Sequence, residues 1–162
     1  MRKSQKGFSL IELLIVVAII LIIAAIAIPN LIRSRMSANE ASAVASLRAI
    51  NTGEVTYNNT YPGTFAALSA LGPDGATCTT PDSTNACLID NLLANATIAN
   101  TAKSGYMFNV TATAATYTSE AEPADQNSTG TRGFCSDQDL VLFYVVVGAG
   151  FSTCTTATGT PL

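Results

Sequence analysis

The chain has 162 residues, a formal net charge of −3, and 48% apolar against 12% charged residues. A typical soluble domain carries about 25% charged residues, so the low charge indicates a segment adapted to an apolar environment. The length suits one compact domain plus an appendage. The absence of histidine excludes Ser-His and Cys-His dyads and His-ligated zinc, so the sequence does not favour an enzyme.

The N-terminal segment is predicted to enter a membrane. Three cations within the first six residues precede a continuous apolar run over 13–28. The uncharged stretch between Glu12 and Arg33 covers about 20 residues, or about 30 Å as a helix, which matches a bilayer core. The cations would stay in the cytoplasm, so the rest of the chain is predicted to be exported.

Two ordinary interpretations of this segment leave Glu12 unexplained. One is a secretory signal peptide cleaved after Ala25-Ile26-Ala27, and the other is a plain transmembrane anchor. A charged carboxylate at the centre of a membrane helix costs roughly 2.5–3.5 kcal/mol, and less near an end. Neither interpretation supplies a partner that offsets this cost.

The sequences KGFSLIELLIVVAII and AIAIPN closely resemble the class III leader and N-terminal helix of type IV pilins and related pseudopilins. The resemblance implies that residues 1–7 are a leader, which a prepilin peptidase removes by cutting after Gly7. Phe8 then becomes the mature N-terminus, usually N-methylated. Glu12 matches the hallmark acid of the family, and Pro29 matches a recurrent helix-kinking proline.

Cleavage would give Glu12 a partner, because it creates an α-ammonium on Phe8 at the same membrane depth. The two groups are four residues apart within one helix. Between staggered subunits, Glu12 of an incoming chain would instead pair with Phe8 of its neighbour, recovering much of the desolvation cost. Glu12 and Phe8 are therefore predicted to set the register of a filament.

A single helix over 8–60, about 80 Å long, is predicted, with a hydrophobic half over 8–29 and an amphipathic half over 30–60. Its second half carries one apolar face, formed by Met36, Ala43, Val44, Leu47, Ile50 and Tyr57. A helix of this length is longer than the diameter of a compact domain of this size. The hydrophobic half is therefore expected to protrude. Pro29 removes a backbone donor and is expected to let the helix bend.

The remainder is predicted to be an α+β head, as in the type IV pilin fold. A variable αβ-loop over 61–104 would hold two short helices, one over 65–71 capped by Thr64 and one within 85–95. An antiparallel sheet over 105–162 would pack on the long helix. Its predicted strands lie at 105–110, 114–120, 132–135 and 140–147, and 120–134 resembles the connection before the last strands of pilin-like heads.

Four cysteines, at 78, 87, 135 and 154, are expected to form disulfides in an exported protein. Their spacings differ from those of a zinc ribbon. Three pairings are possible, and the local one, Cys78–Cys87 with Cys135–Cys154, is preferred because each bridge closes a loop within one segment. The second bridge resembles the C-terminal disulfide loop of many pilins.

Asp137 and Asp139 are weak candidates for a calcium site, like the C-terminal loop of major pseudopilins. Two acids in a hairpin turn usually face solvent, so no metal or other cofactor is predicted.

The resemblance implies a structural subunit that polymerises with identical copies into a surface filament for adhesion, twitching motility or DNA uptake. The precursor would lie in the inner membrane and meet the prepilin peptidase and the pilus assembly machinery. One alternative is a major pseudopilin of a type II secretion system, and another is a secreted, disulfide-bonded binding domain. Removing residues 1–7 deletes three cations and no acid, so no specific nucleic-acid partner is predicted.

Overall fold

The computed structural model describes residues 8–75, 77–146 and 159–162. The leader, including Gly7, and Cys154 lie outside the described residues. The chain divides into two compact units, 1–35 and 36–162. Helix α1 (Leu10–Thr60) begins in the first unit and ends in the second, close to the predicted bounds.

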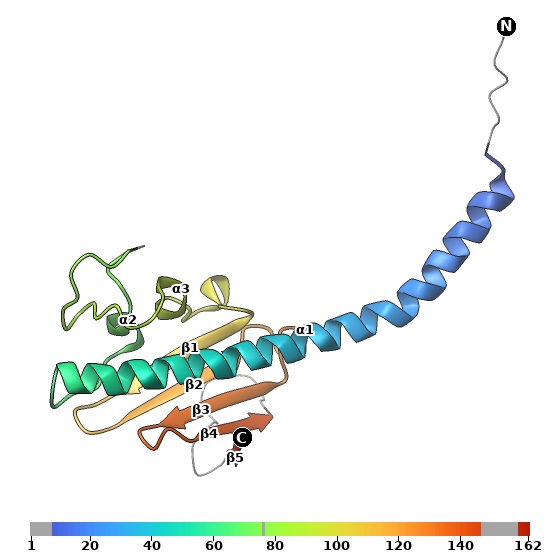
Figure 1. Cartoon of the computed structure of the whole chain (residues 1–162). Helices are drawn as coiled ribbons and strands as arrows, with labels where there is room; N and C mark the ends of the chain where they lie inside the picture. Colours follow the sequence, from blue (N-terminus) through green and yellow to red (C-terminus); the bar gives the residue numbers. More distant parts are fainter. Residues whose placement is uncertain (1–7, 76, 147–158) are drawn as a thin grey trace, which may run out of the picture. The chain divides into compact units, whose positions relative to one another are not determined.

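The second unit is an antiparallel sheet covered by the C-terminal part of α1 (Figure 1). Its strands are β1 (Tyr106–Ala112), β2 (Tyr117–Pro123), β3 (Arg132–Asp137), β4 (Leu142–Val146) and β5 (Thr160–Pro161). The strands pair in sequence order, and each pair is antiparallel. The predicted α+β architecture, a long helix followed by an antiparallel sheet, is confirmed.

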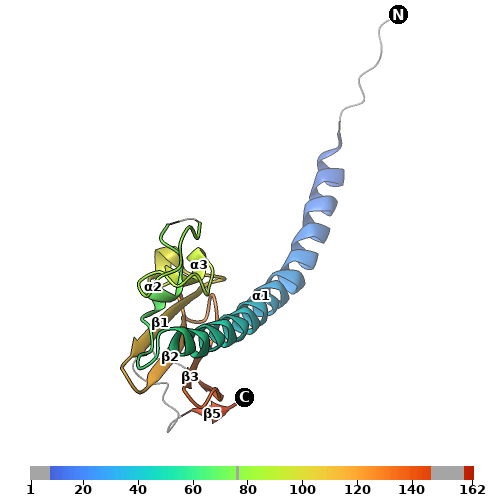
Figure 2. The same cartoon turned by 60° about the vertical axis from the view of Figure 1, so that its left-hand side comes forward.

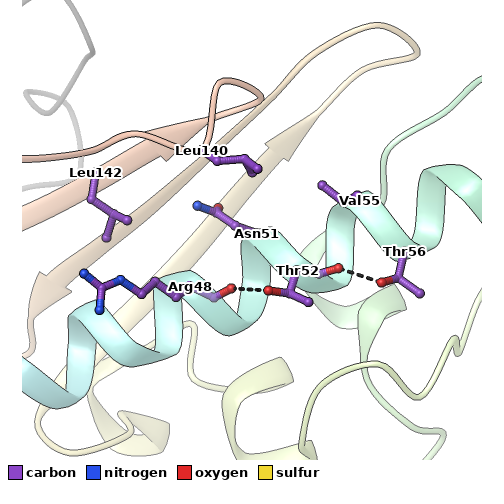
Figure 3. Close-up of a pocket in the computed structure, with 7 residues that line it drawn as sticks. All are labelled: Arg48, Asn51, Thr52, Val55, Thr56, Leu140 and Leu142. Carbon is purple, nitrogen blue, oxygen red and sulfur yellow. Dashed lines mark hydrogen bonds between the residues drawn. The ribbon is translucent and has the colours of Figure 1, made fainter.

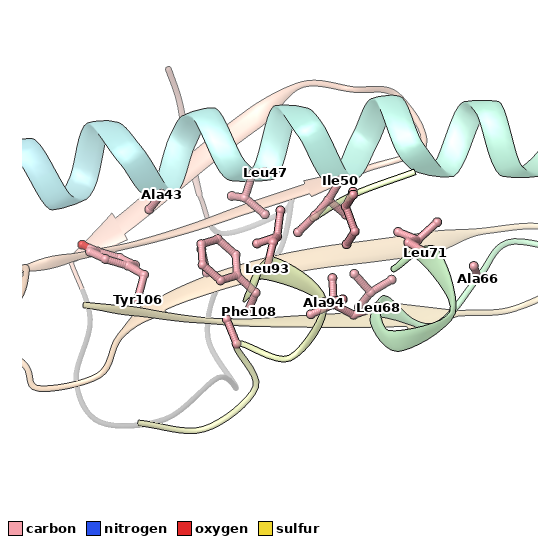
Figure 4. Close-up of a cluster of buried hydrophobic side chains, with 14 of the residues drawn as sticks. Ala43, Leu47, Ile50, Ala66, Leu68, Leu71, Leu93, Ala94, Tyr106 and Phe108 are labelled. Carbon is pink, nitrogen blue, oxygen red and sulfur yellow. The ribbon is translucent and has the colours of Figure 1, made fainter. Parts of the chain in front are cut away.

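The helix packs on the sheet through the apolar face that the sequence predicts (Figure 4). Leu47 and Ile50 of α1 are fully buried, and Phe108 of β1 is buried in the same cluster. Burying one such side chain contributes about 1.5–3 kcal/mol. Met36, at the start of this face, is only half-buried.

Short elements cover the β1 side of the sheet: α2 (Leu68–Leu71), α3 (Asn91–Ala94) and the 3-10 helix η1 (Ala99–Thr101). In Figures 1 and 2, α2 and α3 lie on one flank of α1, and β4 and β5 lie on the other. We call the second unit, 36–162, the head. The head therefore has two different flanks, one on each side of its helix.

The predicted helix over 65–71 with a Thr64 cap is wrong. Only Leu68–Leu71 is helical, and Ala67 occupies the N-cap position. The amide of Phe65 donates to Thr113 O (3.2 Å), and the amide of Ala66 donates to the Glu54 carboxylate (3.0 Å). Because these donors are used in tertiary contacts, the segment before α2 stays extended.

Two further boundaries differ from the prediction. The helix within 85–95 covers only Asn91–Ala94, capped by the Asp90 side chain, because the amides of Ala86 and Leu88 donate to carbonyls of α2. Strand β2 continues through Glu120 to Pro123, inside the predicted connection over 120–134, because these residues pair with β1.

Candidate assembly helix and its attachment to the head

The N-terminal unit presents an apolar surface that is exposed among the residues the structure describes. Every Phe, Leu, Ile and Val between residues 8 and 32 is exposed by 45% or more. By length and composition, α1 is apolar enough to cross a membrane. Such a surface is stable only in lipid or against other apolar helices.

The helix begins two residues after the predicted cleavage site. Phe8 and Ser9 precede the first helical residue, Leu10. The Glu12 carboxylate accepts a hydrogen bond from the Ser9 amide (Oε2–N 3.3 Å). The Ser9-x-x-Glu12 spacing is that of a capping box, in which the acid at the third helical position satisfies the N-cap amide. Glu12 therefore has a local partner even without a free amine on Phe8.

Pro29 does not interrupt the helix. Residues on both sides of it are helical, and the Asn30 side chain donates to Ile26 O (3.2 Å). The proline lacks the N–H that would donate to the carbonyl of Ala25, and the Asn30 bond to the neighbouring carbonyl does not replace it. The kink at Pro29 stays a prediction.

A polar clamp, formed by Glu40, Thr131 and Arg132, ties α1 to the start of β3. Arg132 donates through Nη2 and Nε to Glu40 Oε2 (2.6 and 2.9 Å). The amide and hydroxyl of Thr131 donate to Oε1 (3.0 and 3.1 Å). Although burial alone raises the pKa of Glu40, the hydrogen bonds from Arg132 and Thr131 outweigh it and hold this pKa below its usual value.

Arg132 is fixed on its other side by aromatic rings. Its guanidinium lies 5.3 Å from the Tyr144 ring centroid and 5.7 Å from that of Phe134. Nearby, the Asn39 side chain donates to Thr129 O (2.9 Å). Together these contacts fix the first helical turns of the head against the β2–β3 connection and the sheet.

We expect Arg132→Met to lower the free energy of unfolding by about 2 kcal/mol, because it removes two charge-assisted hydrogen bonds from a buried carboxylate. Urea denaturation of the full chain in detergent measures this loss. Lys103→Met is the matched control. It removes the more exposed Lys103–Asp90 pair (2.6 Å) and should cost less than about 1 kcal/mol. Equal losses in the two variants would contradict a special role for the clamp.

Glu54 is a second buried acid of α1, with 0% exposure. Its Oε2 accepts from the Ala66 amide, whereas Oε1 has no hydrogen-bond partner among the described residues. Burial raises the pKa of Glu54 to about 7, against a small opposing effect of the Ala66 hydrogen bond. The folded head therefore binds a proton at Glu54 more tightly than an unperturbed glutamate does.

Residues 2–28 match a family model described as the prokaryotic N-terminal methylation motif. The chain is 47% identical over 73 residues to the type IV wide pilus major component PilA4 of Thermus thermophilus, covering 43% of this chain and 56% of that protein. It is 48% identical over 53 residues to the type IV major pilin PilA of Myxococcus xanthus, covering 33% of this chain and 24% of that protein.

Similarity extends to a second group. The chain is 34% identical over 73 residues to the type II secretion system core protein G of Aeromonas hydrophila, covering 43% of this chain and 51% of that protein. Over less than half of its length, the chain is thus similar both to type IV pilins and to type II secretion core proteins. It spans about half the length, or less, of these curated relatives, and no solved structure matches it.

The methylation motif contains three of the predicted site residues: Gly7, Phe8 and Glu12. In the described structure, Phe8 and Glu12 both lie at the exposed start of α1. Their predicted roles in cleavage, methylation and filament register stay predictions. The pilin-like sequence therefore coincides with the exposed apolar helix.

Of the two predicted disulfides, Cys78–Cys87 is formed in the structure, with Cα atoms 5.8 Å apart. Cys154 lies outside the described residues, so the Cys135–Cys154 bridge stays a prediction. The Asp137 carboxylate accepts from the amide of Asp139 (3.0 Å) within the β3–β4 turn. Within 8–75, 77–146 and 159–162, acids and cysteines form no group of three or more suited to a metal ion.

Proposed function

We propose that this chain is a structural subunit that polymerises into an extracellular type IV pilus filament. The observation that carries the proposal is the exposed apolar helix over 10–32, which carries a methylation motif and the single carboxylate of Glu12. Identical helices packed side by side bury such a surface without any other partner. The role is mechanical, so no catalytic residue is proposed.

Assembly would follow from the charges at the start of α1. Prepilin peptidase frees the amine of Phe8 while the apolar helix still lies in the cytoplasmic membrane. Glu12 exchanges its local hydrogen bond with Ser9 for the ammonium of a neighbouring Phe8, because an ion pair in lipid stabilises both charges. The pilus machinery then moves each aligned subunit outward into the surface filament, whose outputs include adhesion, twitching motility and DNA uptake.

The second candidate is a major pseudopilin of a type II secretion system, which is favoured by the similarity to core protein G of several bacteria. Both functions would use the cleaved N-terminal helix and the predicted pairing of Glu12 with Phe8 of a neighbouring subunit. They differ in where the filament works. A pilus leaves the cell and must keep its head folded without a controlled supply of ions.

We expect a chelator to leave the melting temperature of the head nearly unchanged and a reductant to lower it by several degrees. Opening the Cys78–Cys87 loop alone is expected to cost about 2 kcal/mol. Calorimetry of the full chain in detergent, with EDTA and dithiothreitol added separately, measures both effects. Unfolding by EDTA together with resistance to reductant would favour the pseudopilin.

The proposal is tested by shearing host cells and assaying the released material for this chain. Filaments of this subunit should be recovered from cells with prepilin peptidase and be absent from cells without it. Recovery of the chain as a soluble monomer, equally with and without the peptidase, would favour the secreted binding domain instead.

A further inference from the structure

The head carries a groove between α1 and the β3–β4 hairpin, with a volume of about 480 Å³. Seven residues line it: Arg48, Asn51, Thr52, Val55, Thr56, Leu140 and Leu142 (Figure 3). Three of them are apolar, and Val55 and Leu140 are exposed by 40% and 47%. Leu140 has a φ of 62°, a strained conformation for a leucine that holds it at the lip of the groove.

With one exception, the polar side chains of the groove already form hydrogen bonds within the chain. The Thr52 and Thr56 hydroxyls donate to carbonyls one turn earlier in α1 (Figure 3). Asn51 donates to Ser136 and accepts from Ser119. Among the described residues, the Arg48 guanidinium makes no hydrogen bond or ion pair. The groove therefore offers an apolar end and one unused cation.

Arg48 is also unusual among the cations of the head. Within the described part of 36–162, Lys103 pairs with Asp90 and Arg132 pairs with Glu40. Several exposed acids of the same unit have no basic partner, including Asp74 and Asp125. A ligand that fits this groove needs a carboxylate for Arg48 and an apolar group for the apolar end. An exposed acid of a second copy of the chain can supply the carboxylate.

One turn supplies both groups, with Pro73 half-buried beside the exposed Asp74. Pro73 and Asp74 follow α2, and Gly75 has a φ of 82°, which favours glycine and holds the turn in shape. Asp74 is exposed and makes no hydrogen bond among the described residues. The α2 flank lies across α1 from the flank that carries β4 (Figure 1). A contact between two different flanks is heterologous and propagates as a helical filament unless its rotation closes a ring, whereas a groove facing a second groove would close a dimer.

We propose that this groove receives the Pro73–Asp74 turn of a second copy, with Asp74 paired to Arg48 and Pro73 packed against the apolar end. The proposal rests on the proposed filament function and adds a contact between heads to the contacts of the N-terminal helices. The pair fixes which neighbour a head meets, since a like-charge pair at this position is repulsive.

A charge swap in full-length chains in the native host tests the proposal. We expect Arg48→Glu and Asp74→Lys each to reduce the sheared filament yield by about fivefold or more, and the double variant to restore it. The matched control combines Arg48→Glu with Asp125→Lys, another exposed acid, and should not restore the yield. Because the Arg48 guanidinium makes no hydrogen bond or ion pair with the described residues of the head, its variants should keep the wild-type melting temperature.

Normal filament yield from Arg48→Glu would overturn the proposal, as would failure of the swap to restore filaments. Should Arg48→Glu melt early, the neutral variants Arg48→Gln and Asp74→Asn give a second test. Each should reduce the filament yield, and the double variant should lose no more than either single variant because all three lack the same pair. Additive losses would overturn the proposal. Failure of the wild type to form filaments would instead overturn the proposed function.

Discussion

Glu12→Ala is expected to leave the precursor inserted and cleaved but to abolish efficient filament growth. The substitution improves the apolar match of α1 to lipid, so residence in the membrane should not suffer. It removes the carboxylate of the apolar segment that would meet the Phe8 ammonium of an adjacent chain. Sheared filament yield, measured against the amount of cleaved chain in the membrane, separates assembly from processing.

A second variant is needed in this experiment, because Glu12 also caps the helix by accepting a hydrogen bond from the Ser9 amide. Glu12→Gln keeps an acceptor for that amide but carries no charge. If Glu12 acts through its charge, the Gln variant fails to assemble as the Ala variant does. Normal filament length and yield from either variant would refute the register role.

Glu54→Gln is expected to stabilise the head progressively as the pH rises. The pKa of Glu54 is about 7 in the folded head, against 4.5 for an unperturbed glutamate, so the folded state binds the proton more tightly. The stability that Glu54 contributes is complete below pH 4.5 and is lost as the pH rises through 7. This difference in pKa between the folded and the unfolded chain corresponds to about 3 kcal/mol of stability. The Gln variant does not lose this stability because Gln cannot ionise.

Urea denaturation of both full-length chains in detergent between pH 4 and 8 measures this difference. Glu122→Gln is a parallel variant, because burial and the nearby Glu120 raise the pKa of Glu122 to about 7 as well. The two variants should each remove part of the alkaline destabilisation, and their effects should add because they lie on different elements. A constant difference between Glu54→Gln and wild type across this pH range would contradict the buried, protonated Glu54.

The long-range organisation could be predicted from the sequence because it depends on strong periodic signals. The helix over 8–60, its apolar face and the strand regions were all visible as patterns of apolar residues. The short helices were not placed correctly, since Phe65, Ala66 and Ala86 use their amides in tertiary contacts that local sequence does not encode. Tertiary hydrogen bonds thus decided the boundaries.

The buried acids of α1 were missed although the sequence carries a signal for them. Glu40 and Glu54 fall in the same three- and four-residue spacing as Ala43, Leu47 and Ile50. Charged residues in an apolar register are normally interpreted as solvent-facing, so their burial was not expected. Their partners, Arg132 and the Ala66 amide, lie 92 and 12 residues away, which no local pattern reveals.

The intact mass of the chain recovered from the cell surface tests the central claim most directly. We expect a subunit that begins at Phe8, with its N-terminus methylated, and that carries its cysteines as disulfides. A chain that begins at Ile28, as left by ordinary signal peptidase after Ala25-Ile26-Ala27, would lack Glu12 and most of the apolar helix, and would contradict the filament function.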